Sequence, residues 1–230
     1  MATINLMLND LDLNALWLTF RLAAVTTMVL LLIGAPLAWW LARTRWRWRF
    51  LVEALVALPL VLPPTVLGFY LLVAMAPDGP VGNVVALLGG PALVFSFSGL
   101  VVGSVVYSLP FVVQPLRNAF VAVGDRPLEV AAALGASPMD RFFTVGVPQA
   151  RAGFLSATVL GFAHTVGEFG VVLMIGGNIP GETRVASIAI YDHVESLEYG
   201  NAHGLSLVLI VLSLVMLSVV FAVNKRGGVA

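Results

Sequence analysis

Long, nearly uncharged apolar runs constrain this chain more than any other feature of its sequence. A helix needs roughly 20 apolar residues to cross the hydrocarbon core of a bilayer. Five stretches qualify: 22–41, 54–76, 95–116, 152–175 and 204–223. They are continuous runs, without the alternation of a membrane β-barrel. With 60% hydrophobic and only 10% charged residues, the chain is predicted to be an all-α integral membrane protein with about five transmembrane helices, forming a single transmembrane domain over residues 1–230.

The individual runs differ in what they predict. The first has no interior charge and is expected to form a peripheral helix. The second contains Pro59, Pro63 and Pro64, and proline disfavours helix both at its own position and in the residue before it. We therefore expect a kink or unwound turn at residues 60–65. Such backbone is tolerated at membrane depth only when it is buried in protein or faces a water-filled cavity.

Two further segments could raise the number of helices. A sixth would arise if residues 84–94 or 185–194 re-enter the bilayer. We expect five.

Basic residues are distributed unevenly among the connectors. Ten of the twelve fall on one side of a five-span arrangement: Arg43, Arg45, Arg47, Arg49, Arg117, Arg126, Arg141, Arg151, Lys225 and Arg226. Cytoplasmic loops carry such an excess of Lys and Arg, so the C-terminus and the long connector at about 117–151 are predicted to be cytoplasmic. Glu53 is expected to pair with the basic cluster at 43–49.

The long connector contains the capping and turn residues of a helix-turn-helix. Asp125 is expected to cap a first short helix, and Gly135 to end it in the left-handed conformation. Ser137 is expected to cap a second helix, with Asp140 three residues on as in a capping box. The first helix is rich in alanine, so its smooth surface suits insertion into a groove of another protein.

This connector resembles the "EAA" loop of ABC-importer permease subunits. The matching residues are Glu129, Ala131, Ala132, Gly135, Val145, Val147 and Pro148. Val130 departs from the pattern by replacing the usual first alanine. In that family the loop sits in a cleft of the cytoplasmic ATPase, so the resemblance implies the type I ABC importer permease fold and an ATPase-coupling role for these residues, with Arg141 as an ion-pair donor to the ATPase. An interfacial connector with well-capped helices is the plainer alternative.

A second window indicates the substrate. Residues 165–184, TVGEFGVVLMIGGNIPGETR, resemble the corresponding stretch of molybdate permease subunits. Related sulfate permeases share the Gly-Glu-Phe-Gly part but typically lack the run at 178–183. The resemblance therefore implies import of molybdate, with tungstate or sulfate as alternatives.

The source of energy is expected to lie outside this chain. A phosphate-binding loop needs a lysine in G-x-x-x-x-G-K-[ST], and the only lysine is Lys225, followed by Arg226. With no cysteine and few histidines, we expect no catalytic residue, metal site or cofactor here. The resemblance implies that ATP and magnesium bind a partner ATPase dimer. It also implies an extracytoplasmic molybdate-binding protein and a second copy of this chain, in the cytoplasmic membrane of a bacterium or archaeon, among lipid and without nucleic acid.

Glu168 is the ionisable residue most deeply placed in a predicted span. An ionised carboxylate repels a molybdate dianion, so direct contact requires a protonated or paired side chain, with His164, Arg21 or a serine as candidate partners. We favour a role in bracing helices or a gate, and take Pro63, Pro64, Glu168 and Gly170 as the candidate pathway or gate residues. Intramembrane carboxylates also mark proton pathways, so a proton-coupled secondary transporter with Glu168 as carrier is the rival hypothesis.

Overall fold

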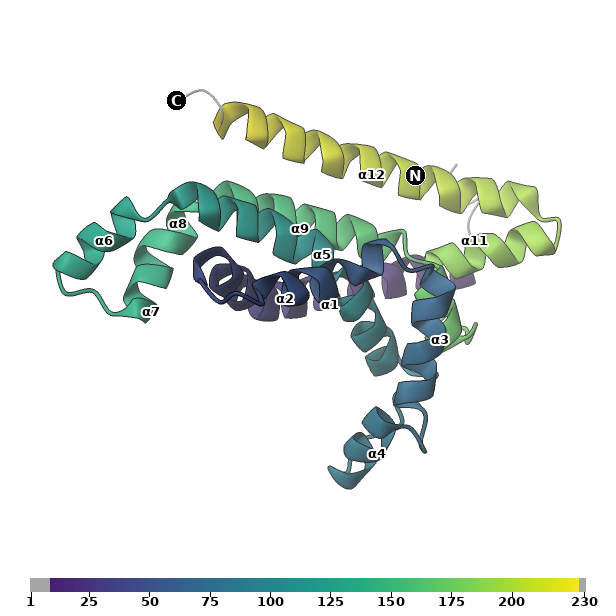
Figure 1. Ribbon diagram of the computed structural model, residues 1–230. Coiled ribbons are helices and arrows are strands. Elements are labelled where there is room, and N and C mark those ends of the chain that lie inside the picture. Colours follow the sequence, from purple (N-terminus) through teal and green to yellow (C-terminus); the bar gives the residue numbers. More distant parts are fainter. Residues whose placement is uncertain (1–8, 228–230) are drawn as a thin grey trace.

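The structure is a computed structural model that describes residues 9–227, and every regular element in that range is helical (Figure 1). The elements are α1 (Asp10–Arg43), α2 (Arg49–Ala57), η1 (Leu58–Leu60), α3 (Pro64–Met75), α4 (Pro80–Leu87), α5 (Phe97–Val123), α6 (Arg126–Ala133), α7 (Pro138–Arg141), η2 (Phe142–Gly146), α8 (Val147–Gln149), α9 (Arg151–Val166), α10 (Gly170–Gly176), α11 (Ala186–Glu195) and α12 (Tyr199–Gly227).

The described part of the chain confirms an all-α protein with about five membrane spans. Four helical segments are long and apolar enough to cross a membrane: Asp10–Arg43, Pro64–Leu87, Phe97–Val123 and Tyr199–Val219. Helices α9 and α10 add a fifth if they are one broken span, since they are bent by 59°. The ten residues of α11 are too few to cross a bilayer at 1.5 Å per residue.

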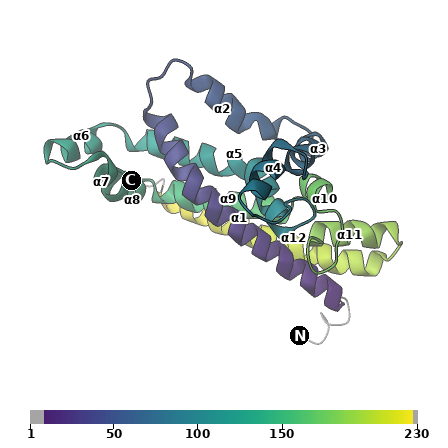
Figure 2. The same cartoon turned by 90° about the horizontal axis from the view of Figure 1, so that it is seen from below.

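Helix α1 packs along its length against α5 and α9 (Figure 2). Its Leu22 and Leu30 are at most 1% exposed, and Leu30 belongs to the same apolar cluster as Val112 and Phe120 of α5. The expectation of a peripheral first helix is therefore wrong. The more peripheral helix is α12, whose apolar window is only 17% buried.

The first helix also begins earlier than the apolar run predicts, at Asp10 instead of residue 22. Asn9 forms a complete capping box with Asp12, which starts the helix within a polar segment. The Asp12 carboxylate is 1% exposed and its oxygen lies 2.8 Å from Nε2 of His193 in α11. A distant partner on another helix thus allows this acidic turn to be buried.

The second apolar run is broken where its prolines predict. Helix α2 ends at Ala57, η1 ends at Leu60, and α3 starts at Pro64 with Pro63 as its N-cap. The predicted break is confirmed, but the run is not one kinked span. Helices α3 and α4 instead project from the bundle as a limb, with α3 packed on α10 (Figure 1).

The fourth run is also interrupted, although no proline lies within it. Helix α9 ends at Val166 with Gly167 as its C-cap, and α10 begins at Gly170. By contrast, α5 continues through both Pro110 and Pro115. The break between α9 and α10 places Glu168 in a short non-helical segment beside α3.

Candidate coupling hairpin and pathway cavity

A polar hairpin stands at one end of the bundle, where α1 and α5 end and α12 brings the chain toward its C-terminus (Figure 1). It comprises α6, a turn, and the continuous helical path α7, η2 and α8. Gly135, in the turn, has φ +90°, and a β-carbon there would meet no atom within 4 Å. The predicted left-handed glycine is therefore confirmed, and its turn is open to solvent.

The predicted caps of the hairpin are confirmed for one helix and wrong for the other. Ser137 and Asp140 form a reciprocal capping box at α7, and these hydrogen bonds, led by the one from the Ser137 hydroxyl, lower the pKa of Asp140. Asp125 makes no capping bond to α6. Its carboxylate instead pairs with the Arg43 guanidinium, because the end of α1 lies within reach. This contact joins residues far apart in sequence, so local spacing does not predict it.

The hairpin exposes both the predicted coupling residues and apolar residues that sequence reasoning missed. Glu129, Ala132, Gly135 and Pro148 are exposed, whereas Ala131 and Arg141 are half-buried. Large apolar side chains are exposed beside them: Val130, Leu134, Met139 and Phe143, between 60% and 84%. These four residues could have been found from the sequence, because they are large apolar residues in an otherwise polar connector. Exposed apolar residues grouped on one element are typical of a protein interface.

Aromatic contacts fix the base of the hairpin to the bundle. Trp39 of α1 packs edge-on against Phe142 at a ring-centroid distance of 5.3 Å and against Phe120 at 5.1 Å. A β-carbon on Gly146 would lie 2.6 Å from the Trp39 ring, so glycine is required for this close approach. A movement of the hairpin would therefore be transmitted to α1.

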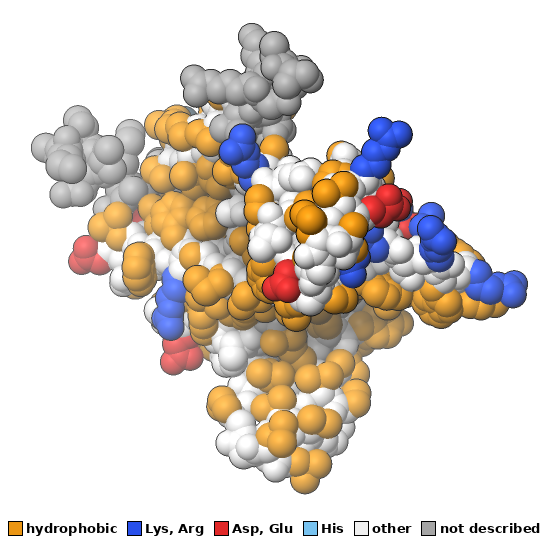
Figure 3. Space-filling view, turned by 90° about the vertical axis from the view of Figure 1, so that its left-hand side faces the viewer, with side chains coloured by type: hydrophobic (Ala, Val, Ile, Leu, Met, Phe, Trp, Pro, Cys, Tyr) orange, Lys and Arg blue, Asp and Glu red, His pale blue; other side chains and the backbone are white. Residues whose placement is uncertain are grey.

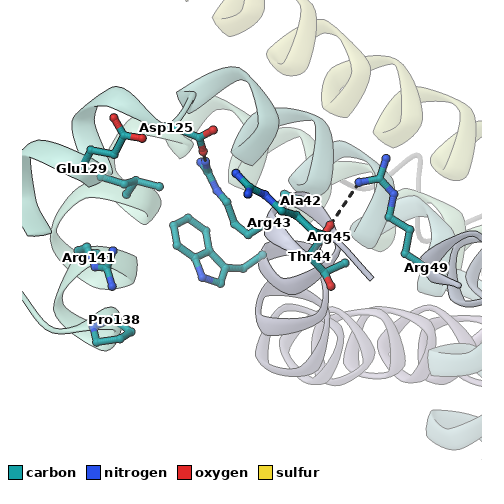
Figure 4. Close-up of a pocket in the computed structure, with 11 residues that line it drawn as sticks. Ala42, Arg43, Thr44, Arg45, Arg49, Asp125, Glu129, Pro138 and Arg141 are labelled. Carbon is teal, nitrogen blue, oxygen red and sulfur yellow. Dashed lines mark hydrogen bonds and ion pairs between the residues drawn. The ribbon is translucent and has the colours of Figure 1, made fainter. Parts of the chain in front are cut away.

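A cavity of about 490 Å³ lies between the hairpin and the end of α1. Figure 4 shows Glu129, Pro138 and Arg141 of the hairpin facing the arginines that follow α1 across this space. Seen from this end in Figure 3, arginine side chains and a few acidic ones stand around the hairpin, while the limb below shows mainly hydrophobic side chains. The side chains of Lys225 and Arg226 lie outside the described residues.

A second cavity, of about 540 Å³, lies where α3 meets the broken α9–α10 pair. Three of the four candidate pathway residues line it: Pro64, Glu168 and Gly170. Pro63 does not, although it is the N-cap of the adjoining helix. Glu168 is 4% exposed, and neither of its carboxylate oxygens has a hydrogen-bond partner among the described residues.

Two of the three partners proposed for Glu168 are engaged elsewhere. His164 is 2.9 Å from the Ser108 hydroxyl through Nδ1 and stacks on Phe111. Arg21 lies over the ring of Phe97, 4.4 Å from its centroid. The described residues also contain no group of three His, Asp or Glu side chains placed to hold a metal ion. The third proposed partner, a serine, remains: the Ser104 hydroxyl is buried without another partner and interacts with the Glu168 carboxylate, which forms no ion pair with a described residue.

The expected pairing of Glu53 with the first basic cluster is wrong. The carboxylate of Glu53 lies 2.9 Å from the Arg117 guanidinium of α5. Helix α2 packs against α5, which directs Glu53 away from residues 43–49.

Comparison with known proteins agrees with this architecture. Residues 34–226 match the family described as "Binding-protein-dependent transport system inner membrane component". The chain is 60% identical over 218 residues to the molybdenum transport system permease protein ModB of Azotobacter vinelandii, covering 95% of this chain and 96% of the relative. It is 33% identical to ModB of Escherichia coli strain K12, with 94% of each chain covered. It belongs to the family of binding-protein-dependent transport system inner membrane components.

Solved structures share the same fold at low identity. A bacterial ABC transporter involved in the import of the acidic polysaccharide alginate gives a TM-score of 0.77 at 16% identity, covering 97% of this chain and 82% of that one. The MetNI methionine ABC transporter gives a TM-score of 0.69 at 18% identity, covering 94% of this chain and 95% of that one. At these identities the likeness concerns the fold alone, and it confirms the predicted importer-permease architecture.

Proposed function

We propose that this chain is the membrane-spanning subunit of an ATP-driven importer that carries molybdate into the cell. The observation that carries the substrate assignment is the 60% identity, over nearly the full length of both chains, to a molybdenum transport permease. Tungstate and sulfate are tetrahedral dianions of the same charge and remain the alternative substrates.

The hairpin is proposed as the element that an ATPase subunit holds. Its exposed Leu134, Met139 and Phe143 supply an apolar contact area, and Glu129 and Arg141 supply charges of both signs. Ala131, Ala132, Gly135 and Pro148 give it a smooth surface and a fixed turn. ATP and magnesium would bind the ATPase, and closure of an ATPase dimer would move two such hairpins together. Since Trp39 joins each hairpin to α1, that movement would reach the membrane helices.

The assembly is proposed to contain two copies of this chain, an ATPase dimer in the cytoplasm and a molybdate-binding protein outside. One chain carries one hairpin, so two ATPase subunits require two permease subunits. Few cationic residues lie within the spans, which favours a weakly binding passage and places affinity for the anion in the external protein. The basic end of the bundle would face the cytoplasm of the inner membrane.

Uptake of labelled molybdate into proteoliposomes tests this proposal. The vesicles would contain the complete importer, with this chain or its Gly135→Asp variant, and would enclose ATP. We expect ATP-dependent uptake that excess sulfate does not abolish, and loss of uptake in Gly135→Asp because a charge enters the proposed docking surface at φ +90°. Gly135→Asn is the matched control, since it has similar size and backbone preference without the charge.

Two results would contradict the proposal. Normal uptake by Gly135→Asp would remove the coupling assignment. Uptake that needs no ATP and collapses with the proton gradient would support the second candidate, a proton-coupled transporter. The unpaired, buried Glu168 is the observation that favours that candidate.

A further inference from the structure

The cavity between the end of α1 and the hairpin carries an excess of positive charge. Four guanidinium groups and two carboxylates line it: Arg43, Arg45, Arg49, Arg141, Asp125 and Glu129. Asp125 pairs with Arg43. The other three arginines form no ion pair with any residue that the structure describes, and Arg49 reaches only the Thr44 carbonyl, at 3.3 Å. The lining charge therefore favours an anion in this cavity.

Arg141 shows the same deficit at atomic level. Its side chain is half-buried, and its Nε atom is buried without a hydrogen-bond partner among the described residues. A buried donor left unpaired costs free energy, and more so when it belongs to a charged group. An anion in the cavity would supply the missing acceptor.

The surroundings place the cavity at the level of lipid headgroups. Trp40, Trp46 and Trp48 adjoin it in sequence and are between 41% and 48% exposed. Tryptophan gathers at membrane–water interfaces. Basic pockets beside spanning helices on the cytoplasmic side bind anionic headgroups, and the planar guanidinium fork matches phosphate oxygens in a bidentate way.

We propose that this cavity binds a phosphate-type oxyanion through Arg45 and Arg141. The same chemistry has two sources, the headgroup of an anionic phospholipid in the cytoplasmic leaflet and a free inorganic anion in the cytoplasm. Glu129 also lines the cavity, so an anion there must be held by both arginines against its repulsion. Because Arg45 follows α1 and Arg141 belongs to α7, the bound anion links the bundle to the hairpin and holds the hairpin in place. This binding does not depend on which substrate the protein transports.

Lipid and anion binding to the purified full-length chain tests the proposal. Native mass spectrometry would compare phosphatidylglycerol with phosphatidylcholine, and calorimetry would titrate inorganic phosphate. The variant is Arg45→Gln combined with Arg141→Gln. Arg47→Gln is the matched control, because Arg47 lies on the same connector but stacks on Trp48 and does not line the cavity.

We expect phosphatidylglycerol to bind at least tenfold more tightly than phosphatidylcholine, and the double variant to lose that preference while Arg47→Gln keeps it. Binding of inorganic phosphate with the same dependence on the two arginines, and without a lipid preference, would identify the free anion as the occupant. Absence of both, or an equal loss in Arg47→Gln, would overturn the site. If the double variant does not fold, each single Gln variant is compared in the same way, with an expected loss of affinity for phosphatidylglycerol of about threefold.

Discussion

Arg43, the last residue of α1, pairs with Asp125, the residue before α6, and also donates a hydrogen bond to the Phe120 carbonyl at 2.9 Å. Arg43 and Asp125 are 82 positions apart in sequence. Their contact joins the first membrane helix to the first helix of the hairpin. It is therefore placed to transmit movement between the membrane part and the proposed docking element.

Asp125→Asn is expected to uncouple the hairpin without unfolding the protein. The Asp125 side chain is 74% exposed, and exposed ion pairs contribute only about 0–1 kcal/mol to stability. We expect nearly unchanged melting, but several-fold less substrate imported per ATP hydrolysed by the reconstituted importer. Arg47→Gln, which removes a charge from the neighbouring connector, serves as control. An unaltered ratio in Asp125→Asn would show that this contact does not couple the two parts.

Glu168→Gln is expected to retain at least half of the transport rate. Burying an ionised carboxylate without an ion-pair partner is unfavourable, and glutamine reproduces the shape of the neutral acid. Glu168→Ala, which empties part of the cavity wall, is expected to lose most activity. The measurement is the initial rate of uptake, normalised to the amount of complex. Abolished transport in Glu168→Gln would mean that the ionised carboxylate is required.

Gly170→Ala is expected to disturb the contact between α3 and α10. A β-carbon at Gly170 would lie 2.7 Å from the Cβ of Pro64, whose ring cannot turn aside. We expect a destabilisation of about 1–3 kcal/mol, as for other overpacked sites, seen as a lower melting temperature. Gly167→Ala lines the same cavity and is the control, since its nearest neighbour, the Ala163 carbonyl oxygen, is at 3.7 Å. Equal melting of the two variants would contradict this steric account.

The contact between α1 and α11 is expected to weaken as pH rises. Burial of the His193 ring opposes protonation, but hydrogen bonds to the Asp12 and Glu198 carboxylates outweigh it and raise the pKa of His193. The stabilisation is complete below the unfolded value of about 6.5 and is lost as pH passes the higher folded value. The melting temperature should then fall by about 2–4 °C per kcal/mol lost.

The control for this pH effect is His203→Gln, because His203 is exposed. Melting followed from pH 6 to pH 9 should give the same slope for His203→Gln as for the unaltered protein. His193→Gln should remove the slope. A slope that persists in His193→Gln would assign the effect to another group.

Local signals predicted much of the fold and of the candidate site. Proline spacing located the break before α3, and Gly135 with Ser137 located the turn and second cap of the hairpin. Each of these features depends on a few consecutive residues, so the physical cause is contained in the segment itself. The role of the hairpin in coupling stays a prediction, since it requires a partner.

Pairings between distant segments could not be predicted in the same way. Glu53 and Asp125 each had a plausible neighbour in sequence, yet they pair with Arg117 and Arg43. An ion pair forms with whichever opposite charge the helices bring within about 4 Å, and the direction of α2 and the end of α1 are set by apolar contacts elsewhere in the bundle. Short-range spacing contains no information about that choice.

The apolar runs, their charge asymmetry and the turn residues of the connector were sufficient to establish a helical membrane protein with a polar hairpin at its basic end. How much of each helix is buried depended on three-dimensional contacts, because several runs are equally apolar and hydrophobicity alone does not distinguish a lipid-facing helix from a buried one. The same holds for Glu168, whose burial in a cavity wall results from the bend between α9 and α10 and from the approach of α3. Burial and partnership are properties of the assembled helices, and they become defined only when those helices meet.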